Sequence, residues 1–132
     1  MIVPDASYVL AAMLPDEPGD PNALELLKSE SAAAPSIWPI EVANAILVAV
    51  RRKRISPDEA LSLLDILAKL DVELVTSSLA DVARNVVPLA RKHRLTAYDA
   101  AYLDVARSKA ATLMTIDRDL RTAAEAEDVV VL

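Results

Sequence analysis

The chain alternates short apolar runs with segments that have the pattern of helices, and this alternation restricts its fold more than any other feature. Each run is too short for a buried helix and long enough for a buried strand. Because strands that alternate with helices form parallel sheets covered on both faces, we expect a three-layer α/β/α sandwich with a central, mainly parallel sheet of about five strands. The expected strands are residues 1–3, 36–38, 72–76, 112–116 and 129–132.

Helix signals mark the segments between these runs. Ser56 and Glu59 have the spacing of a capping box, with a proline at the first helical position between them. Pro39 predicts the start of another helix. Pro88 cannot lie inside an unbroken helix, so residues 79–93 are expected to form two short helices or one kinked helix.

The length and composition fit one domain that spans residues 1–132. The chain is 54% hydrophobic and contains no cysteine, which excludes a disulfide framework, a zinc knuckle and a thiol nucleophile. No apolar run reaches the roughly 18 residues of a membrane span, and the N-terminus lacks the basic start of a signal peptide, so we expect a cytoplasmic protein without a membrane partner. The net charge of -6 argues against a simple DNA-coating protein, and a polyanionic partner would need a local basic patch or a metal.

Residues 42–50 are apolar almost all the way round the expected helix, interrupted only by Asn44. Such a helix is either buried in the core or shared with another chain. Core burial and a dimer interface both remain open for this segment.

Four carboxylates occur near the ends of expected strands. Asp5 and Asp117 directly follow the first and fourth runs, Glu41 lies in the first turn of the helix after the second run, and Asp99 opens a later helix. Because ligands bind outside the carboxyl ends of the strands in such sheets, all four can face one crevice. Oxygen ligands without histidine or cysteine select Mg²⁺ or Mn²⁺. Such an ion lowers the pKa of a bound water and holds a phosphate oxygen, which is the chemistry of phosphodiester hydrolysis.

Each of these acids also has an ordinary structural role open to it. Asp5 and Asp117 can be helix N-caps, Glu41 can complement a helix dipole, and Asp99 can form a capping box with Thr96. Capping does not, however, require four carboxylates at the same end of one sheet. Competing phosphate sites are excluded, since a single glycine cannot build a Walker A loop or a dinucleotide fingerprint.

The segments around these acids resemble the PIN-domain nucleases, and more narrowly the VapC-like toxins of type II toxin–antitoxin pairs. The resemblance runs from the first expected strand to the last. The segments are Val3-Pro4-Asp5-Ala6-Ser7, Pro39-Ile40-Glu41-Val42-Ala43-Asn44-Ala45, Leu95-Thr96-Ala97-Tyr98-Asp99-Ala100-Ala101-Tyr102-Leu103 and Met114-Thr115-Ile116-Asp117-Arg118-Asp119-Leu120.

The resemblance implies an acidic pocket of Asp5, Glu41, Asp99 and Asp117. In this pocket Asp5, Asp99 and Asp117 would hold Mg²⁺ or Mn²⁺ directly or through water, and Glu41 would orient water or a second ion. Three further positions would support the site: Ser7, Thr115 and Asp119. Asp119 has an equally good role in the helix dipole. Two departures leave every carboxylate in place: Pro4 is less usual before the first aspartate, and Arg94 stands where such toxins often have glycine.

The activity implied is that of a metal-dependent endoribonuclease toxin, a homodimer neutralised by a cognate antitoxin. A catalytically silent dimerising interaction module of the same fold is the alternative. RNA would need cationic contacts on this acidic chain, and two basic runs are the candidates. Because cations are also favoured at helix C-termini by the dipole, a purely structural role stays open for both runs. The candidate residues are Arg51, Arg52, Lys53, Arg54, Arg91 and Lys92.

Overall fold

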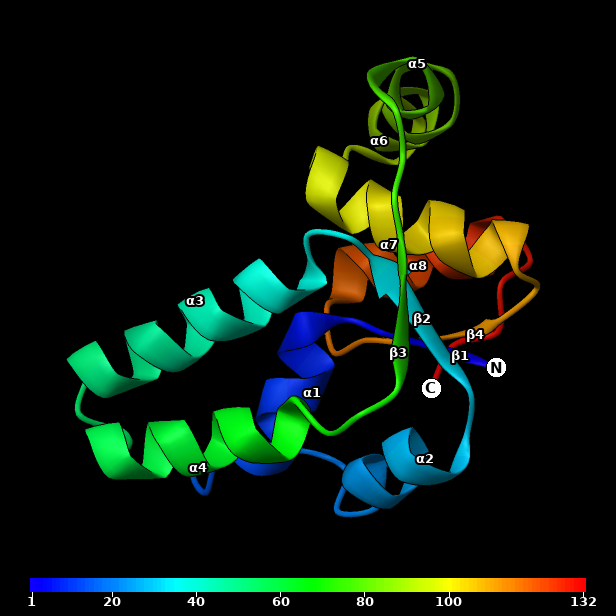
Figure 1. The fold of residues 1–132 in the computed structure, drawn as a ribbon. Helices are drawn as coiled ribbons and strands as arrows, with labels where there is room; N and C mark the ends of the chain where they lie inside the picture. The colour runs from blue at the N-terminus through cyan, green and yellow to red at the C-terminus, as the bar shows by residue number, and fades with distance from the viewer.

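The computed structural model describes residues 1–132 and consists of a parallel sheet between two layers of helices (Figure 1). Four strands pair in the order β3-β2-β1-β4, and every pairing is parallel. Ile2 lies opposite Ala32 on one side and Thr112 on the other, so the strands start at the same edge of the sheet. This confirms the predicted α/β/α class. The strands are β1 (Ile2–Pro4), β2 (Ala32–Pro35), β3 (Val72–Val75) and β4 (Thr112–Met114).

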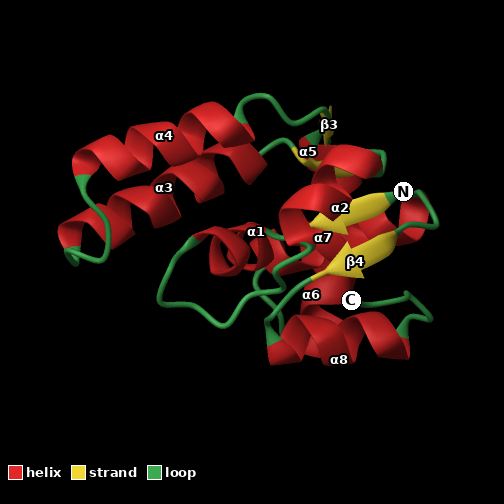
Figure 2. Cartoon of the chain, turned by 90° about the horizontal axis from the view of Figure 1, so that it is seen from below, coloured by secondary structure: helices red, strands yellow, loops and turns green.

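Helix α7 packs across β1, β2 and β4, with α8 beside it, and the segment from α5 to α6 lies beyond α7 (Figure 1). On the other face, α1 contacts α2 and α3. Helices α3 and α4 form a pair that extends away from the sheet (Figure 2). The helices are α1 (Ala6–Met13), α2 (Ala23–Ser29), α3 (Trp38–Arg51), α4 (Pro57–Leu67), α5 (Leu79–Asp81), the π-helical turn η1 (Val82–Val86), α6 (Val87–His93), α7 (Ala97–Ser108) and α8 (Arg118–Ala126).

Two of the expected strands are wrong in detail. The second strand is β2, Ala32–Pro35, and residues 36–38 instead form a turn and the start of α3. Alanine favours helices, but these alanines are buried between neighbouring strands and under α7, and burial decides strand formation. The expected fifth strand at 129–132 is reduced to one parallel bridge between Val131 and Leu113.

Pro88 is accommodated without a break. The helical segment from α5 to α6 is continuous, and η1 widens it to π-helical form just before the proline. Proline removes one helical hydrogen bond and clashes with the carbonyl four residues earlier, and a π-type turn relieves both problems. Of the two predicted arrangements, the single irregular helix is therefore the one observed.

Four helices end with a non-glycine residue in the left-handed conformation, because the chain has a single glycine and uses it elsewhere. Arg94, which stands where VapC-like toxins often have glycine, has φ 56° and ψ 37° after α6. Gly19 is required for a different reason: a Cβ there would lie 2.1 Å from the carbonyl oxygen of Ala11. The residues at the four helix ends are Lys53, Arg94, Ala110 and Asp128.

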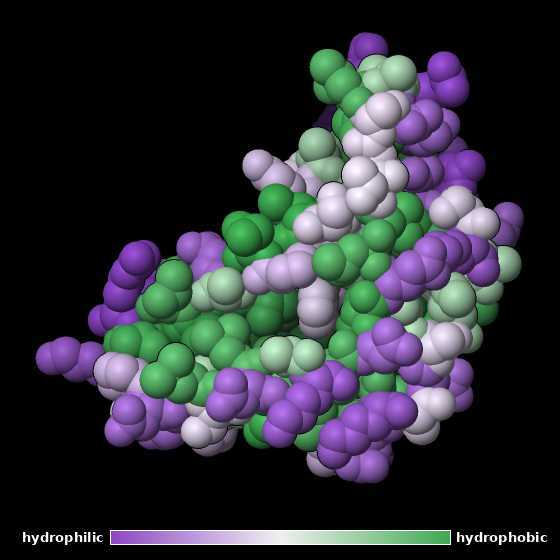
Figure 3. Space-filling model, in the orientation of Figure 1, coloured by the Kyte–Doolittle hydropathy of each residue, from purple (hydrophilic) through white to green (hydrophobic).

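The apolar helix α3 serves the core on one side only. Val42, Ile46 and Ala49 are buried in a hydrophobic cluster of 32 residues. Ile40 and Leu47 are 66% and 51% exposed, and Figure 3 shows apolar surface over α3 and α4. One face of α3 is therefore buried in the core, and the opposite face is exposed and available to a partner. None of the helices has the length and hydropathy needed to cross a membrane.

Candidate active site

Asp5 is held at the carboxyl end of β1 by two hydroxyl groups. It caps α1, accepting a hydrogen bond from the Ser7 backbone N–H, and its Oδ2 accepts from Ser7 Oγ at 2.6 Å. The same oxygen accepts from Thr115 Oγ1 at 2.8 Å. Asp5 is only 8% exposed, so these donors replace much of its hydration. Two of the three residues expected to support the site, Ser7 and Thr115, thus contact Asp5.

Thr115 joins the ends of β1 and β4. Its Oγ1 donates to Asp5 and accepts from the backbone N–H of Asp117 at 3.1 Å. Asp117 itself caps α8, with Oδ1 accepting from the Leu120 N–H at 2.8 Å. Asp119 lies exposed in the first turn of α8 and makes no side-chain hydrogen bond, so its two expected roles, an extra acid of the site and a partner of the helix dipole, both stay predictions.

Asp99 and Glu41 approach the same edge from α7 and α3. The Thr96 hydroxyl accepts from the Asp99 N–H at 3.1 Å and donates to Asp99 Oδ2 at 2.7 Å. Glu41 accepts a short hydrogen bond from the Tyr102 hydroxyl. Asp5 and Asp117 are therefore helix N-caps, whereas α7 is capped by Thr96, and the expected capping box is incomplete because the Asp99 carboxylate bonds the Thr96 hydroxyl and not its backbone N–H.

The charges of these four carboxylates act on one another. Burial raises the pKa of Glu41, and repulsion from Asp5 and Asp99 raises it further against the lowering effect of Tyr102. Burial likewise raises the pKa of Asp99, together with repulsion from Asp117 and Asp5. The four residues predicted to form an acidic pocket lie close enough to interact electrostatically.

This set of donors fits a hard divalent cation by its chemistry. Every ligand is oxygen, and a cation would relieve the mutual repulsion. In the structure as it stands, no group of three His, Cys, Asp or Glu side chains is arranged to hold one ion. Each carboxylate is instead held by its own hydroxyl or backbone donor. Shared coordination therefore requires the carboxylates to turn toward one another.

Tyr102 is a site residue to which the sequence analysis assigned no role. It is 1% exposed and lies one turn after Asp99 on α7, so the same helix contributes an acid and a hydroxyl to the site. Its hydroxyl group donates a hydrogen bond to Glu41. Burial and the Glu41 contact raise its pKa, so it stays a donor. A tyrosine one turn after an acid on the same helix is the local signal that could have indicated it.

The predicted basic contacts divide into paired and unpaired cations. Arg54 binds Asp16 and Glu17 at 2.7 and 2.8 Å, and Lys92 binds Glu127 at 2.7 Å. The remaining cations form no ion pair with this chain: Arg51, Arg52, Lys53 and Arg91. Arg51 and Arg91 lie in the last turns of α3 and α6, where the helix dipole also favours them.

Comparison with known proteins identifies the family. A model of the PIN domain matches residues 2–126, and the chain belongs to the PIN-domain family. It is also 32% identical over 119 residues to Ribonuclease VapC3 of Pyrobaculum aerophilum, an alignment that covers 90% of this chain and 91% of that protein. The resemblance to PIN-domain and VapC-like proteins is thereby confirmed.

Solved structures agree on the fold. PAE2754 from Pyrobaculum aerophilum superposes with a TM-score of 0.73 at 24% identity, covering 98% of this chain and 82% of that one. VapBC2 from Rickettsia felis, bound to a DNA fragment from their promoter, superposes with a TM-score of 0.66 at 19% identity, covering 100% of this chain and 98% of that one. FitAcB from Neisseria gonorrhoeae superposes with a TM-score of 0.62 at 17% identity, covering 100% of this chain and 96% of that one.

Proposed function

We propose that the chain is a metal-dependent endoribonuclease toxin that hydrolyses RNA phosphodiester bonds at the acidic edge of the sheet. The observation that carries this proposal is that four carboxylates from separate segments, Asp5, Glu41, Asp99 and Asp117, gather at one edge of the sheet. Thr115 bonds both Asp5 and the Asp117 N–H, and Tyr102 joins the helix of Asp99 to Glu41. The similarity to Ribonuclease VapC3 over nearly the whole length of both chains supports the same activity.

In this proposal Asp5, Asp99 and Asp117 hold Mg²⁺ or Mn²⁺. When bound, the ion supplies an activated water and neutralises charge that develops on the phosphate. Glu41 would orient the attacking water through Oε1, the oxygen that Tyr102 leaves free, and would accept its proton. The bond from the water oxygen to phosphorus would form as the bond from phosphorus to the 3′ oxygen breaks, and the departing 3′ oxygen would take a proton from solvent. Ser7 and Thr115 hold the Asp5 carboxylate at the carboxyl end of β1 by donating hydrogen bonds to its Oδ2, which is how a second shell of residues positions a ligand.

The unpaired cations are the best candidates for contacts to the RNA backbone. Arg51 lies about 15 Å along α3 from Glu41, at 1.5 Å per residue. An RNA strand whose cleaved phosphate lies at the acids can therefore place a phosphate several nucleotides away near Arg51. Arg52 and Lys53 extend the same run. We exclude Arg54 and Lys92 from the primary contacts because their charges are already paired.

The exposed apolar residues of α3 and α4 support assembly with other chains. Ile40, Leu47 and Leu61 are all more than half exposed, and apolar surface of this kind marks interaction sites. We propose a homodimer and a cognate antitoxin as the partners. The similarity to VapBC2 and FitAcB is consistent with such partners. The same surface supports the alternative, an interaction module without catalysis.

The deciding experiment compares the wild type with Asp99→Asn and with a matched control, Asp65→Asn. Asp65 is exposed on α4, which carries none of the four acids, so its replacement removes the same charge outside the candidate site. Metal-stripped proteins that fold and oligomerise alike are mixed with a broad set of structured RNAs, and Mg²⁺ or Mn²⁺ is then added. We expect metal-dependent cleavage by the wild type and by Asp65→Asn, and none by Asp99→Asn.

Two other results would lead to different conclusions. Equal cleavage by Asp99→Asn would reject the acidic edge as the active site and point to a contaminating nuclease. Absence of cleavage by all three proteins would favour the interaction module, provided that they still dimerise.

A further inference from the structure

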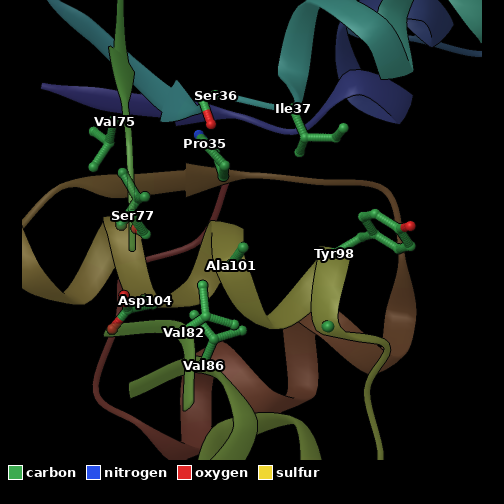
Figure 4. A pocket seen from close by; sticks show the side chains of 12 residues that line it. Pro35, Ser36, Ile37, Val75, Ser77, Val82, Val86, Tyr98, Ala101 and Asp104 are labelled. Carbon is green, nitrogen blue, oxygen red and sulfur yellow. The ribbon is translucent and has the colours of Figure 1, made fainter. Parts of the chain in front are cut away.

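A cavity of about 220 Å³ opens between the carboxyl ends of β2 and β3, η1 and α7 (Figure 4). Its walls are mainly apolar and include Pro35, Val75, Val82 and Val86. None of the four acids of the candidate active site lines it. It is therefore a separate site, which the proposed chemistry leaves without a role.

The cavity borders the acidic edge at two points. Tyr98, the neighbour of Asp99, lies at one end of it, and Ile37, one turn before Glu41 on α3, lines it as well. The carboxyl ends of parallel strands are where ligands bind in α/β sheets. A ligand held in the cavity can thus continue past Tyr98 onto the acids.

Asp104 gives the cavity a polar end. Figure 4 shows Asp104 and Tyr98 at opposite ends of the cavity with Ala101 between them. Six residues of α7 separate the two, which corresponds to about 9 Å along the helix axis at 1.5 Å per residue. The Asp104 carboxylate is half-buried, and it has neither a hydrogen bond nor an ion pair with another side chain of this molecule. Burial raises its pKa against the opposing effect of Arg107. A partly buried carboxylate in this state lacks a donor that a ligand can supply.

The size and walls of the cavity select a small flat ligand. Cavities for drug-sized molecules measure about 300–1,000 Å³, so this one fits a single ring system better than a larger ligand. Apolar walls suit the faces of such a ring, and Asp104 requires an N–H group at its edge. A nucleobase with an exocyclic amine meets these requirements, and unpaired RNA bases are commonly recognised by stacking and edge hydrogen bonds.

We propose that this cavity binds one unpaired nucleobase of an RNA strand whose backbone crosses the acidic edge. The exocyclic amine of the base donates to Asp104, and the 60% exposed ring of Tyr98 stacks on the strand at the rim. The inference rests on the proposed ribonuclease function, which brings RNA to this edge. It predicts selection of guanine, adenine or cytosine over uracil, because uracil has no exocyclic amine.

The test measures binding without metal, so that no strand is cleaved. A fluorescent decamer of uridine with one central guanosine is compared with the same decamer carrying inosine, which lacks only the exocyclic amine. In EDTA, we expect the wild type to bind the guanosine decamer roughly tenfold more tightly by fluorescence anisotropy, the effect of one hydrogen bond to a charged group. This comparison changes the RNA alone and does not depend on the folding of a variant.

Variants then assign the preference to the cavity. Asp104→Asn is expected to abolish the difference between the two decamers, whereas Asp65→Asn, with the same loss of charge, retains it. Tyr98→Ala is expected to lower the affinity for both decamers about fivefold or more. Tyr98→Phe is expected to bind them like the wild type, because stacking needs the ring and not the hydroxyl.

The possible failures are distinguishable from those of the nuclease proposal. Equal binding of the two decamers, or no binding of either, overturns the nucleobase site even if the wild type cleaves RNA with metal. Such a result leaves the cavity to a cationic side chain of a protein partner. Amine-dependent binding by a protein that cleaves no RNA would instead retain the site and reject the nuclease.

Discussion

Glu41 and Glu127 are both glutamates bound by neighbouring side chains, yet their surroundings are opposite. Glu127 follows α8 and accepts hydrogen bonds from Lys92 at 2.7 Å and Arg107 at 3.0 Å, with His93 Nε2 also 2.7 Å away. The hydrogen bond from Lys92, followed by that from His93, lowers the pKa of Glu127 to about 2.

Glu41 has a single donor and faces other acids. Tyr102 bonds one of its oxygens, while burial and repulsion from Asp5 and Asp99 raise its pKa. A carboxylate matched by cations stabilises the native structure, whereas carboxylates gathered against one another destabilise it unless a cation joins them. Acids of the second kind are candidates for function, and those of the first kind are candidates for structure.

Glu41→Gln should reduce RNA cleavage more than any other substitution at the two glutamates or at their partners. It also distinguishes most clearly between a functional role of Glu41 and a structural role like that of Glu127. Glutamine still accepts the Tyr102 hydrogen bond but cannot orient water as an anion, so metal-dependent RNA cleavage should fall on the order of 10³-fold. The free energy of unfolding in urea should not fall, because buried charge and repulsion are removed. Cleavage at the wild-type rate, or a clear loss of stability, would place Glu41 in the same structural class as Glu127.

Tyr102→Phe should lower cleavage by about 10–100-fold, the usual cost of losing a group that orients an active-site ligand. The affinity for Mn²⁺, measured by calorimetry, should stay close to that of the wild type, because Tyr102 contacts Glu41 and none of the three proposed ligands. Tyr8→Phe is the matched control, because Tyr8 is also buried and donates to a carboxylate, Asp20 Oδ2, at 3.0 Å. Equal effects of the two substitutions on cleavage would show that Tyr102 acts through the fold alone.

Much of the acidic edge could be predicted because its signals are local. Asp5 and Asp117 follow apolar runs directly, and a strand end fixes the edge of the sheet at which an acid lies. The capping box of Ser56 and Glu59 is likewise confirmed, with both of its hydrogen bonds present. Pro88 limited the possible helices to two arrangements before the structure distinguished between them.

The features that were missed depend on contacts between distant segments. Ala32–Pro35 has helix-favouring alanines, and only its place between β1 and β3 makes it a strand. Tyr102 finds Glu41 across 61 residues, so no local pattern links the two. The cavity between β3, η1 and α7 exists only when these elements pack together.

Glu127→Gln should leave RNA cleavage unchanged and lower the free energy of unfolding by about 1–2 kcal/mol, because two cations and His93 lose their acceptor charge. The pKa of this carboxyl falls from 4.5 in the unfolded chain to about 2 in the folded one. Its stabilisation is thus present above about pH 4.5 and lost as the pH falls through 2. The free energy of unfolding, measured in urea over this pH range, should fall more steeply with decreasing pH for the wild type than for Glu127→Gln. Parallel declines would mean that the cluster of cations does not hold this carboxylate.

Lys92→Gln and Arg91→Gln should have the smallest effects on stability and RNA binding. Together they test which of the two cations contacts the RNA backbone. Lys92 is 64% exposed and paired with Glu127, so its loss should cost under about 1 kcal/mol and leave the salt dependence of RNA binding unchanged. Arg91 has no such partner, and Arg91→Gln should reduce the slope of log K against log salt by about one, the share of a single phosphate contact. Equal reductions of this slope by the two substitutions would show that Lys92 leaves Glu127 when RNA binds. The cations around Glu127 would then belong to the RNA-binding surface. No change with Arg91→Gln would restrict Arg91 to the helix dipole.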